Sequence, residues 1–266
     1  MIRDITLGQY FPGESWIHRL DPRVKIIATL LFVVELFIVD TYWGFLAAIA
    51  ALAVVINVSK VPLSYILRGL KPIFVIIIFT FVLNLFVIPG KVLVQIGPLS
   101  ISEEGVYTAV FMAARLILLI IGTSLLTLTT KPMSLTDGIE ALLSPFSKIG
   151  VPAHELAMMM TIALRFIPTL LEETDKIMKA QQARGADFET GNILQRIKAL
   201  IPILIPLFIN AFRIAHDLAM AMEARCYRGG QFRTRMNAMK FGGNDAVACV
   251  LLAVFLGVMI LLRIIL

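Results

Sequence analysis

Apolar residues gather in long runs along this chain, and five runs approach the roughly 20 residues that a helix needs to cross a bilayer. They lie at about 24–39, 42–58, 72–89, 105–129 and 244–266. This pattern predicts an all-α polytopic membrane protein with about five transmembrane helices. The composition agrees, because 59% of the 266 residues are apolar and only 16% are charged, whereas soluble domains carry about 25% charged residues.

A sixth apolar stretch, at 199–215, does not fit a membrane crossing. Basic residues stand on both sides of it and Arg213 stands within it, although basic residues normally gather on one side of a membrane. Pro202 and Pro206 also interrupt the stretch. We therefore predict a helix that is buried in protein or lies along the membrane face.

Lysine and arginine are distributed unevenly among the connecting segments. The segment at 131–240 carries 14 of them. Of the two opposite connections, Asp40-Thr41 carries none and the segment at 91–102 carries only Lys91. Because basic loops stay in the cytoplasm, we expect a cytoplasmic N-terminus and an extracellular C-terminus. The net charge of +6 then reflects these loops, and no nucleic-acid partner is expected. The outer segment at 91–102 alternates apolar and polar residues, which predicts a small β-hairpin.

The segment between the fourth and fifth spans is expected to form two long helices, at about 153–184 and 192–225. Apolar positions recur at helical spacing in the first, Pro168 should kink it, and Gly185 gives a natural stop. The second is apolar nearly all round over its first two-thirds, so we expect it to be buried on several sides.

Three regions follow from these expectations. Residues 1–130 would form an N-terminal membrane region, 131–243 a cytoplasmic helical region, and 244–266 a C-terminal span.

Both long helices end in Ala-Arg followed by a small residue. A small neighbour lets another surface approach the backbone, and a guanidinium offers a rigid fork of donors that suits a carboxylate. The same arginines could instead complement the negative end of the helix dipole or extend into solvent, and the residues alone leave both interpretations open. The two copies are Ala183-Arg184-Gly185 and Ala224-Arg225-Cys226.

The chain lacks the common catalytic and metal-binding motifs. There is no G-x-x-x-x-G-K-[ST] phosphate loop, no H-E-x-x-H or paired-cysteine metal motif, and no G-x-S-x-G elbow. His154-Glu155 stands at a helix start, where we interpret it as a cap rather than a metal ligand. We expect a non-catalytic protein without a metal or cofactor of its own, so that energy for uphill transport would come from a partner.

Two charged residues fall within predicted spans. Arg115 lies near the middle of the fourth span, and Glu35 lies in the outer half of the first. Charges inside a membrane usually pair or mark a functional site. We predict that these two form a structural ion pair.

Three stretches together resemble one known family: "HRLDPRVKI" at 18–26, "LRFIPTLLEETDKIMKAQQARGADF" at 164–188 and "AMEARCYRGG" at 221–230. The combination looks like the transmembrane coupling subunit, or T component, of energy-coupling factor (ECF) transporters. These are ABC-type importers of vitamins and metal ions. The resemblance covers nearly the whole chain.

The resemblance implies a multi-pass protein of the bacterial cell membrane with three partners, namely two ABC-type ATPase subunits and a small membrane-embedded S component that binds substrate. ATP and Mg would be bound by the ATPases. Two coupling helices would each end in an x-Arg-x motif that docks into one ATPase. The arginines would be Arg184, beside Ala183 and Gly185, and Arg225, beside Ala224 and Cys226. The family usually has glycine where Cys226 stands.

The main alternative is a self-contained secondary transporter or channel. It would need a polar path through its own spans, and those spans contain few polar residues. The cargo stays open, as does the choice between a dedicated and a shared module, since substrate recognition would belong to the S component.

Overall fold

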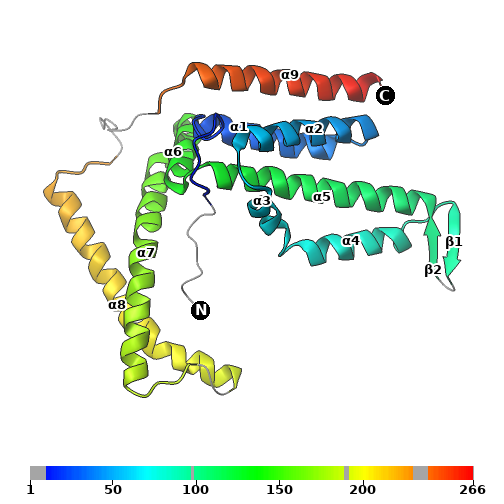
Figure 1. Ribbon diagram of the computed structural model, residues 1–266. Coiled ribbons are helices and arrows are strands. Elements are labelled where there is room, and N and C mark those ends of the chain that lie inside the picture. The colour runs from blue at the N-terminus through cyan, green and yellow to red at the C-terminus, as the bar shows by residue number, and fades with distance from the viewer. Residues whose placement is uncertain (1–9, 97–98, 189–191, 230–238, 266) are drawn as a thin grey trace. The chain divides into compact units, whose positions relative to one another are not determined.

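The computed structural model of the chain (Figure 1) describes residues 10–96, 99–188, 192–229 and 239–265. The described residues are helical apart from one short hairpin and the connections. They divide into two compact units, one formed by Gly8–Gly138 with Ala238–Leu266 and the other by Ile139–Asn237. We describe each unit by itself.

In the first unit, helix α5 lies at the centre and contacts α1, α2, α3 and α4, while α9 packs against α1 and α2 (Figure 1). Aliphatic side chains from these helices, among them Leu36, Ala48, Leu128 and Met259, form the core. Lipid is as apolar as these side chains, so close packing rather than removal from water holds the helices together. The elements are α1 (Pro22–Ile38), α2 (Tyr42–Ser59), α3 (Leu63–Leu70), α4 (Phe74–Val87), β1 (Val92–Ile96), β2 (Leu99–Ser102), α5 (Glu103–Thr129), α9 (Gly243–Ile265) and the first half of α6 (Pro132–Leu143). The second half of α6, from Ile139, belongs to the other unit.

Local signals set where α1 and α5 begin. The Asp21 carboxylate accepts a hydrogen bond from the Arg23 amide at 2.9 Å, and Pro22 occupies the first helical position, where its missing N–H does no harm. At α5, the Ser102 hydroxyl accepts from the Gly105 amide at 2.9 Å. Each side chain satisfies an amide that the helix itself leaves unpaired.

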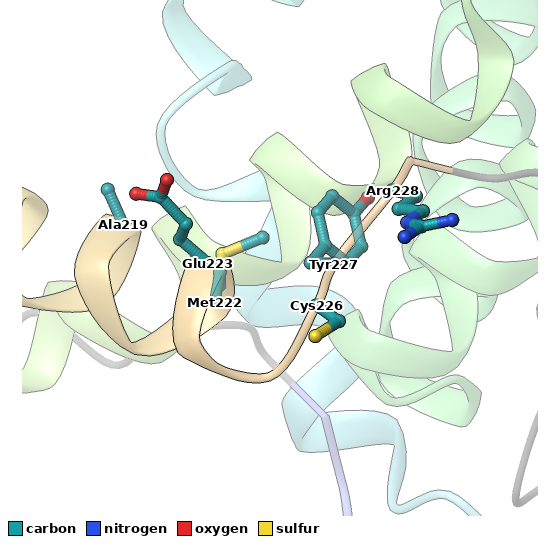
Figure 2. Close-up of a pocket in the computed structure, with 6 residues that line it drawn as sticks. All are labelled: Ala219, Met222, Glu223, Cys226, Tyr227 and Arg228. Carbon is teal, nitrogen blue, oxygen red and sulfur yellow. The ribbon is translucent and has the colours of Figure 1, made fainter.

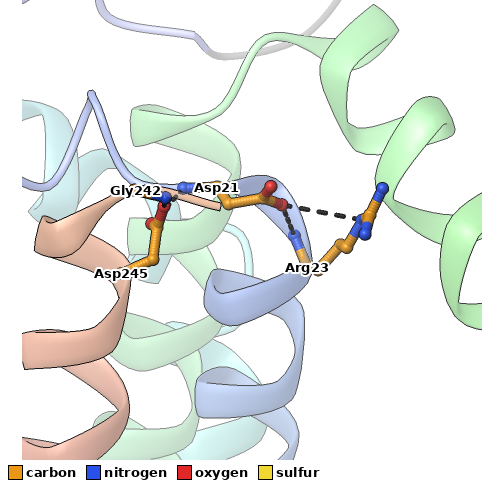
Figure 3. Close-up of polar contacts among 4 residues, drawn as sticks. All are labelled: Asp21, Arg23, Gly242 and Asp245. Atoms are coloured by element: carbon orange, nitrogen blue, oxygen red, sulfur yellow. Dashed lines mark hydrogen bonds and ion pairs between the residues drawn. The ribbon is translucent and has the colours of Figure 1, made fainter. Parts of the chain in front are cut away.

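A buried aspartate joins the start of α9 to the start of α1 (Figure 3). One carboxylate oxygen of Asp245 accepts from the Asp21 amide at 2.7 Å, and the other accepts from the Gly242 amide at 2.8 Å. Asp245 is 4% exposed. Charge-assisted bonds of this kind are about twice as strong as neutral ones, so Asp245 fixes the beginning of the last helix against α1.

The predicted hairpin is confirmed, because β1 and β2 pair antiparallel. Helix α4 lies within the predicted span at 72–89. A short helix that the sequence did not predict, α3, precedes it, and the two meet at a bend of 59°. Pro72 lies in the break and has no N–H with which to continue the hydrogen bonds of α3.

Five of the described helices are long and apolar enough to cross a membrane, or up to six if α3 and α4 count as one span. The set includes α2, α5 and α9, which coincide with predicted spans, and also α7 and α8. Helix α1, with 17 residues, falls outside it. Length and composition thus support a polytopic membrane protein but do not separate α7 and α8 from membrane spans.

The second unit contains a 3-10 turn (Ser144–Ile149) followed by α7 (Ala153–Ala183) and α8 (Ile193–Ala224). The two long helices are confirmed to within one residue at each end. Each continues through its internal prolines. They contact each other as an antiparallel pair (Figure 1), since the Gln181 side chain near the end of α7 donates to the Pro202 carbonyl in the first third of α8 at 3.4 Å.

The prediction that α8 is buried on several sides is wrong for this chain alone. Leu204, Phe208 and Phe212 are 46%, 61% and 73% exposed. An apolar surface of this kind on a folded protein marks contact with another protein or a membrane.

Candidate functional site

The ends of α7 and α8 share one backbone conformation. Arg184 closes α7 at φ −87° and ψ 4°, and Arg225 closes α8 at φ −91° and ψ 12°. The next residues, Gly185 and Cys226, both turn into the left-handed region, at φ 89° and 57°. Each arginine is therefore the last residue before the backbone enters the left-handed conformation.

The hydrogen bonds at the two ends also match. After α7, Gly185 N–H donates to the Gln182 carbonyl at 2.9 Å and Ala186 N–H donates to the Gln181 carbonyl at 3.0 Å. The same two bonds recur after α8, where Cys226 N–H donates to the Glu223 carbonyl at 2.8 Å and Tyr227 N–H donates to the Met222 carbonyl at 3.0 Å. Both ends are Schellman motifs. The x-Arg-x tripeptide is thus the C-cap of a helix, with arginine at the capping position.

This geometry explains the glycine that follows Arg184. A Cβ added at Gly185 would meet no atom within 4 Å, so the position restricts conformation rather than space. Glycine adopts a positive φ freely, whereas an L-residue with a Cβ loses about 1–2 kcal/mol there. Cys226 therefore carries a small backbone strain that Gly185 does not.

Both arginines are exposed, as are Ala183 and Ala224 beside them. Among the described residues, neither guanidinium takes part in an ion pair. The two sites also lie far apart. Gln181 contacts Pro202, and Arg225 follows Pro202 by 23 positions, so at 1.5 Å per residue roughly 35 Å of helix separates the two sites. The geometry suits contact with two separate surfaces.

The second arginine site is tied to the start of α7 by a residue that the sequence did not single out. The Tyr227 hydroxyl lies 3.2 Å from Nε2 of His154 and 3.0 Å from the Met158 sulfur. Nδ1 of His154 lies 3.0 Å from a carboxylate oxygen of Glu140. The interpretation of His154 as a helix cap is thus wrong, since its ring joins α6 to Tyr227. No periodicity links positions 154 and 227, so only the fold reveals this contact.

A cavity of about 440 Å³ opens beside the Arg225 cap (Figure 2). Met222, Cys226 and Tyr227 of the capping turn line it, together with Glu223 and Arg228. A partner that binds Arg225 would also find a recess with apolar walls and two charges of opposite sign.

The predicted ion pair between Arg115 and Glu35 does not form. Arg115 Nη2 instead pairs with Asp40 at 2.9 Å and donates to the Val39 carbonyl at 2.8 Å. Val39 caps α1 and its carbonyl has no partner within the helix, so the end of α1 attracts the guanidinium. Glu35 is 5% exposed, and its carboxylate oxygens have no hydrogen-bond partner among the described residues.

The part of the chain that the structure describes contains no group of three or more histidine, cysteine, aspartate or glutamate side chains placed to hold a metal ion. Cys226 and Cys249 are exposed free thiols.

Comparison with known proteins identifies a family and several close relatives of this chain. Residues 13–236 match the CbiQ family, described as cobalt transport protein. The chain is 62% identical over 247 residues to the energy-coupling factor transporter transmembrane protein EcfT of Thermosediminibacter oceani, covering 93% of each chain. It is 59% identical to the protein of the same name from Clostridium kluyveri, covering 99% of this chain and 98% of the relative. For the Bacillus subtilis protein of that name the identity is 45%, over 99% of this chain and all of the relative.

Proposed function

Because this chain belongs to the family of energy-coupling factor transporter transmembrane proteins, we propose that it couples two ABC-type ATPase subunits to an S component. As a family member it is the transmembrane T component of an ECF transporter in a bacterial cell membrane. The proposal adds the direction of coupling. ATP, with Mg, would be bound and hydrolysed on the partners, and their motion would reach the S component through α7 and α8.

The observation that carries the proposal is the matched pair of arginine caps. Two ABC-type ATPase subunits would each offer a groove, and this chain presents Arg184 and Arg225 in equivalent backbone settings, both exposed. When an arginine forms a buried, hydrogen-bonded charge pair across an interface, truncating its side chain weakens binding by about 2–5 kcal/mol. A guanidinium at a rigid helix end can therefore hold a partner and also move with it.

The exposed apolar face of α8 supports the second half of the proposal. Leu204, Phe208 and Phe212 lie on the helix that ends in Arg225. An S component is itself a membrane protein, so an apolar surface on it would cover this face. One rigid helix would then contact an ATPase at its end and the S component along its length.

The cargo follows from the family at the level of a class. We propose uptake of a vitamin or a metal ion, with recognition on the S component. The N-terminus would be cytoplasmic and the C-terminus extracellular. A self-contained secondary transporter or channel is the alternative, and transport by this chain alone in proteoliposomes would favour it.

The proposal is tested by reversing the two arginine charges. We expect Arg184→Glu and Arg225→Glu each to lower ATP-driven uptake at least tenfold, because a carboxylate repels the acceptor that the guanidinium would bind. Arg213→Glu, an exposed arginine within α8, is the control. The measurement is uptake in cells, with affinity purification to identify what stays bound.

Loss of the ATPases from the double variant, with the S component retained, would support the proposal. Normal uptake by both single variants would refute it.

A further inference from the structure

A second cavity, in the first unit, has the features of a binding site and no role in the function proposed above. Its volume is about 340 Å³, room for about ten waters at roughly 30 Å³ each. It lies between the segment before α1 and the junction of α5 with α6. The residues that line it include Arg19, Lys25, Thr130 and Lys131, together with the acidic Glu14.

Thr130 supplies the strongest indication of a ligand. It is 4% exposed, and its hydroxyl has no hydrogen-bond partner among the residues that the structure describes. A buried polar group without a partner is unfavourable by about 1–3 kcal/mol. Such groups are uncommon in folded proteins unless water, an ion or a ligand completes them.

Lys25 brings a buried positive charge to the same cavity. It is 7% exposed, and its ammonium donates to the carbonyls of Thr129 at 3.0 Å and His18 at 3.2 Å. An ammonium has three N–H donors, so one remains after these two bonds. The carboxylates of Asp21 and Asp245 partly offset the charge of Lys25, but they bond to backbone amides and do not line the cavity.

The other lining groups add two donors, Arg19 and Lys131, and one carboxylate, Glu14. Lys131 lies at the rim, with its ammonium 5.8 Å from the centre of the Tyr10 ring. Arg19 pairs with Glu14 at 3.5 Å, and the Glu14 side chain is 91% exposed. Glu14 thus lines the open side of the cavity, where Arg19 offsets its charge. The His18 ring is a wall, since Ser15 and the Phe11 carbonyl occupy both of its nitrogens.

From this arrangement we infer that the cavity binds a phosphate group. A phosphate presents only acceptor oxygens, and Lys25, Thr130 and Lys131 offer only or chiefly donors. The Thr130 hydroxyl and the third ammonium N–H of Lys25 would gain the partner that each lacks. Binding there would fasten the segment before α1 to the end of α5.

The phosphate has two chemical sources that the site itself does not distinguish. It could belong to the headgroup of an anionic phospholipid, because the cavity lies at the ends of α1 and α5 that are predicted to face the cytoplasm. It could also be free inorganic phosphate. Both would satisfy the same donors.

The test uses the purified full chain and two probes. Inorganic phosphate is titrated in lipid-free detergent at constant ionic strength, and binding is followed as a shift in melting temperature. Retention of phosphatidylglycerol against phosphatidylcholine is measured by native mass spectrometry. The variant is Thr130→Val, which keeps the side-chain shape and removes the hydroxyl. The control is Thr127→Val, an exposed position in the last turn of α5, the helix that Thr130 caps.

We expect Thr130→Val to bind the active probe about tenfold more weakly, the usual result of losing one hydrogen bond to a charged group. Thr127→Val should bind as the wild type does. Without ligand, Thr130→Val should melt no lower than wild type, because the lost hydroxyl had no protein partner. This last measurement separates a loss of binding from a failure to fold.

Saturable binding of phosphatidylglycerol alone would assign the site to a lipid headgroup, and saturable binding of inorganic phosphate would assign it to the free anion. Either result, with the expected loss in Thr130→Val, supports the inference. The inference fails if neither probe binds saturably, or if Thr130→Val binds as tightly as wild type. These outcomes are independent of the ATPase coupling proposed above.

Discussion

The two residues that follow Arg184 and Arg225 differ in how easily they adopt their backbone conformation. Gly185 reaches φ 89° without strain, whereas Cys226 holds φ 57° with a side chain attached. Their hydrogen bonds are otherwise the same. A pair of opposite substitutions can therefore isolate the effect of φ on each cap.

We predict that Cys226→Gly raises and Gly185→Ala lowers the melting temperature of the full chain by about 2–4 °C each, equivalent to about 1 kcal/mol. The Gly185→Ala effect is conformational, because an added Cβ meets no neighbour. Thermal unfolding followed by circular dichroism in detergent measures both. A fall in both variants would contradict the assignment of strain to Cys226.

His18 orders the segment before α1 and is sensitive to pH. The Phe11 carbonyl, 3.1 Å from Nε2, can only accept, so Nε2 carries the proton. Nδ1, 2.6 Å from the Ser15 oxygen, then accepts from the hydroxyl. Burial lowers the pKa of His18 below its ordinary 6.5, and the nearby Lys25 charge lowers it further, although the bond to Phe11 acts against them. Folding therefore favours the neutral form of the His18 ring.

Because this pKa is lower in the folded than in the unfolded chain, the unfolded chain binds more protons. The stabilisation from His18 is therefore fully present above pH 6.5 and is lost as pH falls through the lower folded-state pKa. We predict a melting temperature that decreases below that pH, with a smaller decrease in His18→Gln. The exposed His216→Gln is the control. An equal decrease in His18→Gln and wild type would contradict the prediction.

The sequence predicts the role of a single residue well where the signal is local and poorly where the role depends on contacts between distant segments. The helix stop at Gly185 was predictable because glycine is the commonest residue in that position. The partner of Arg115 was not, because apolar runs give no helix register and Asp40 lies beyond the end of α1. Thr130 gave no signal at all, since its isolation depends on how distant segments pack.

At the scale of elements, α7 and α8 are joined near both ends. Gln181 contacts Pro202 at one end, and Tyr227 contacts His154 and Met158 at the other. The contacts of Tyr227 place the cap of Arg225 against the beginning of α7. Residue 186, the equivalent position after Arg184, is alanine and cannot make such a contact.

We predict that Tyr227→Phe loosens the Arg225 cap while leaving the Arg184 cap unchanged. Losing the hydroxyl contacts should make the amides of residues 222–229 exchange about fivefold faster, as expected for about 1 kcal/mol. Hydrogen exchange read by mass spectrometry measures this, and residues 181–186 provide an internal control. Unchanged exchange at 222–229 would show that the backbone bonds alone hold this cap.

The long helices were predictable and their environment was not. Apolar periodicity located α7 and α8 to within a residue because each is long and its end signals are strong. The same periodicity could not say which molecule buries α8. Likewise, the break between α3 and α4 escaped notice because a short helix before Pro72 looks like a basic loop.

At the scale of the whole molecule, the proposed contacts with ATPases and with the S component use different surfaces. The arginine caps lie at helix ends, whereas Phe208 and Phe212 lie along α8. Substitutions in one surface should therefore spare the other.

We predict that Phe208→Ser with Phe212→Ser lowers recovery of the S component at least tenfold while the ATPases remain bound. The reason is the loss of apolar contact, at roughly 25 cal/mol per Å². Affinity purification with quantitative mass spectrometry is the measurement, and Val250→Ser on α9, also exposed, is the control. Loss of the ATPases together with the S component would mean that the two surfaces are not separate.

The left-handed residue after each arginine also limits how these motifs can change over evolutionary time. Proline and β-branched residues are poorly tolerated at φ 89° or 57°, whereas glycine and asparagine are accepted. Whether related proteins carry glycine or cysteine at position 226 would then show how much backbone strain this helix end tolerates. Variation there would leave the guanidinium of Arg225 in place, so a lineage could lose the glycine and keep the proposed contact.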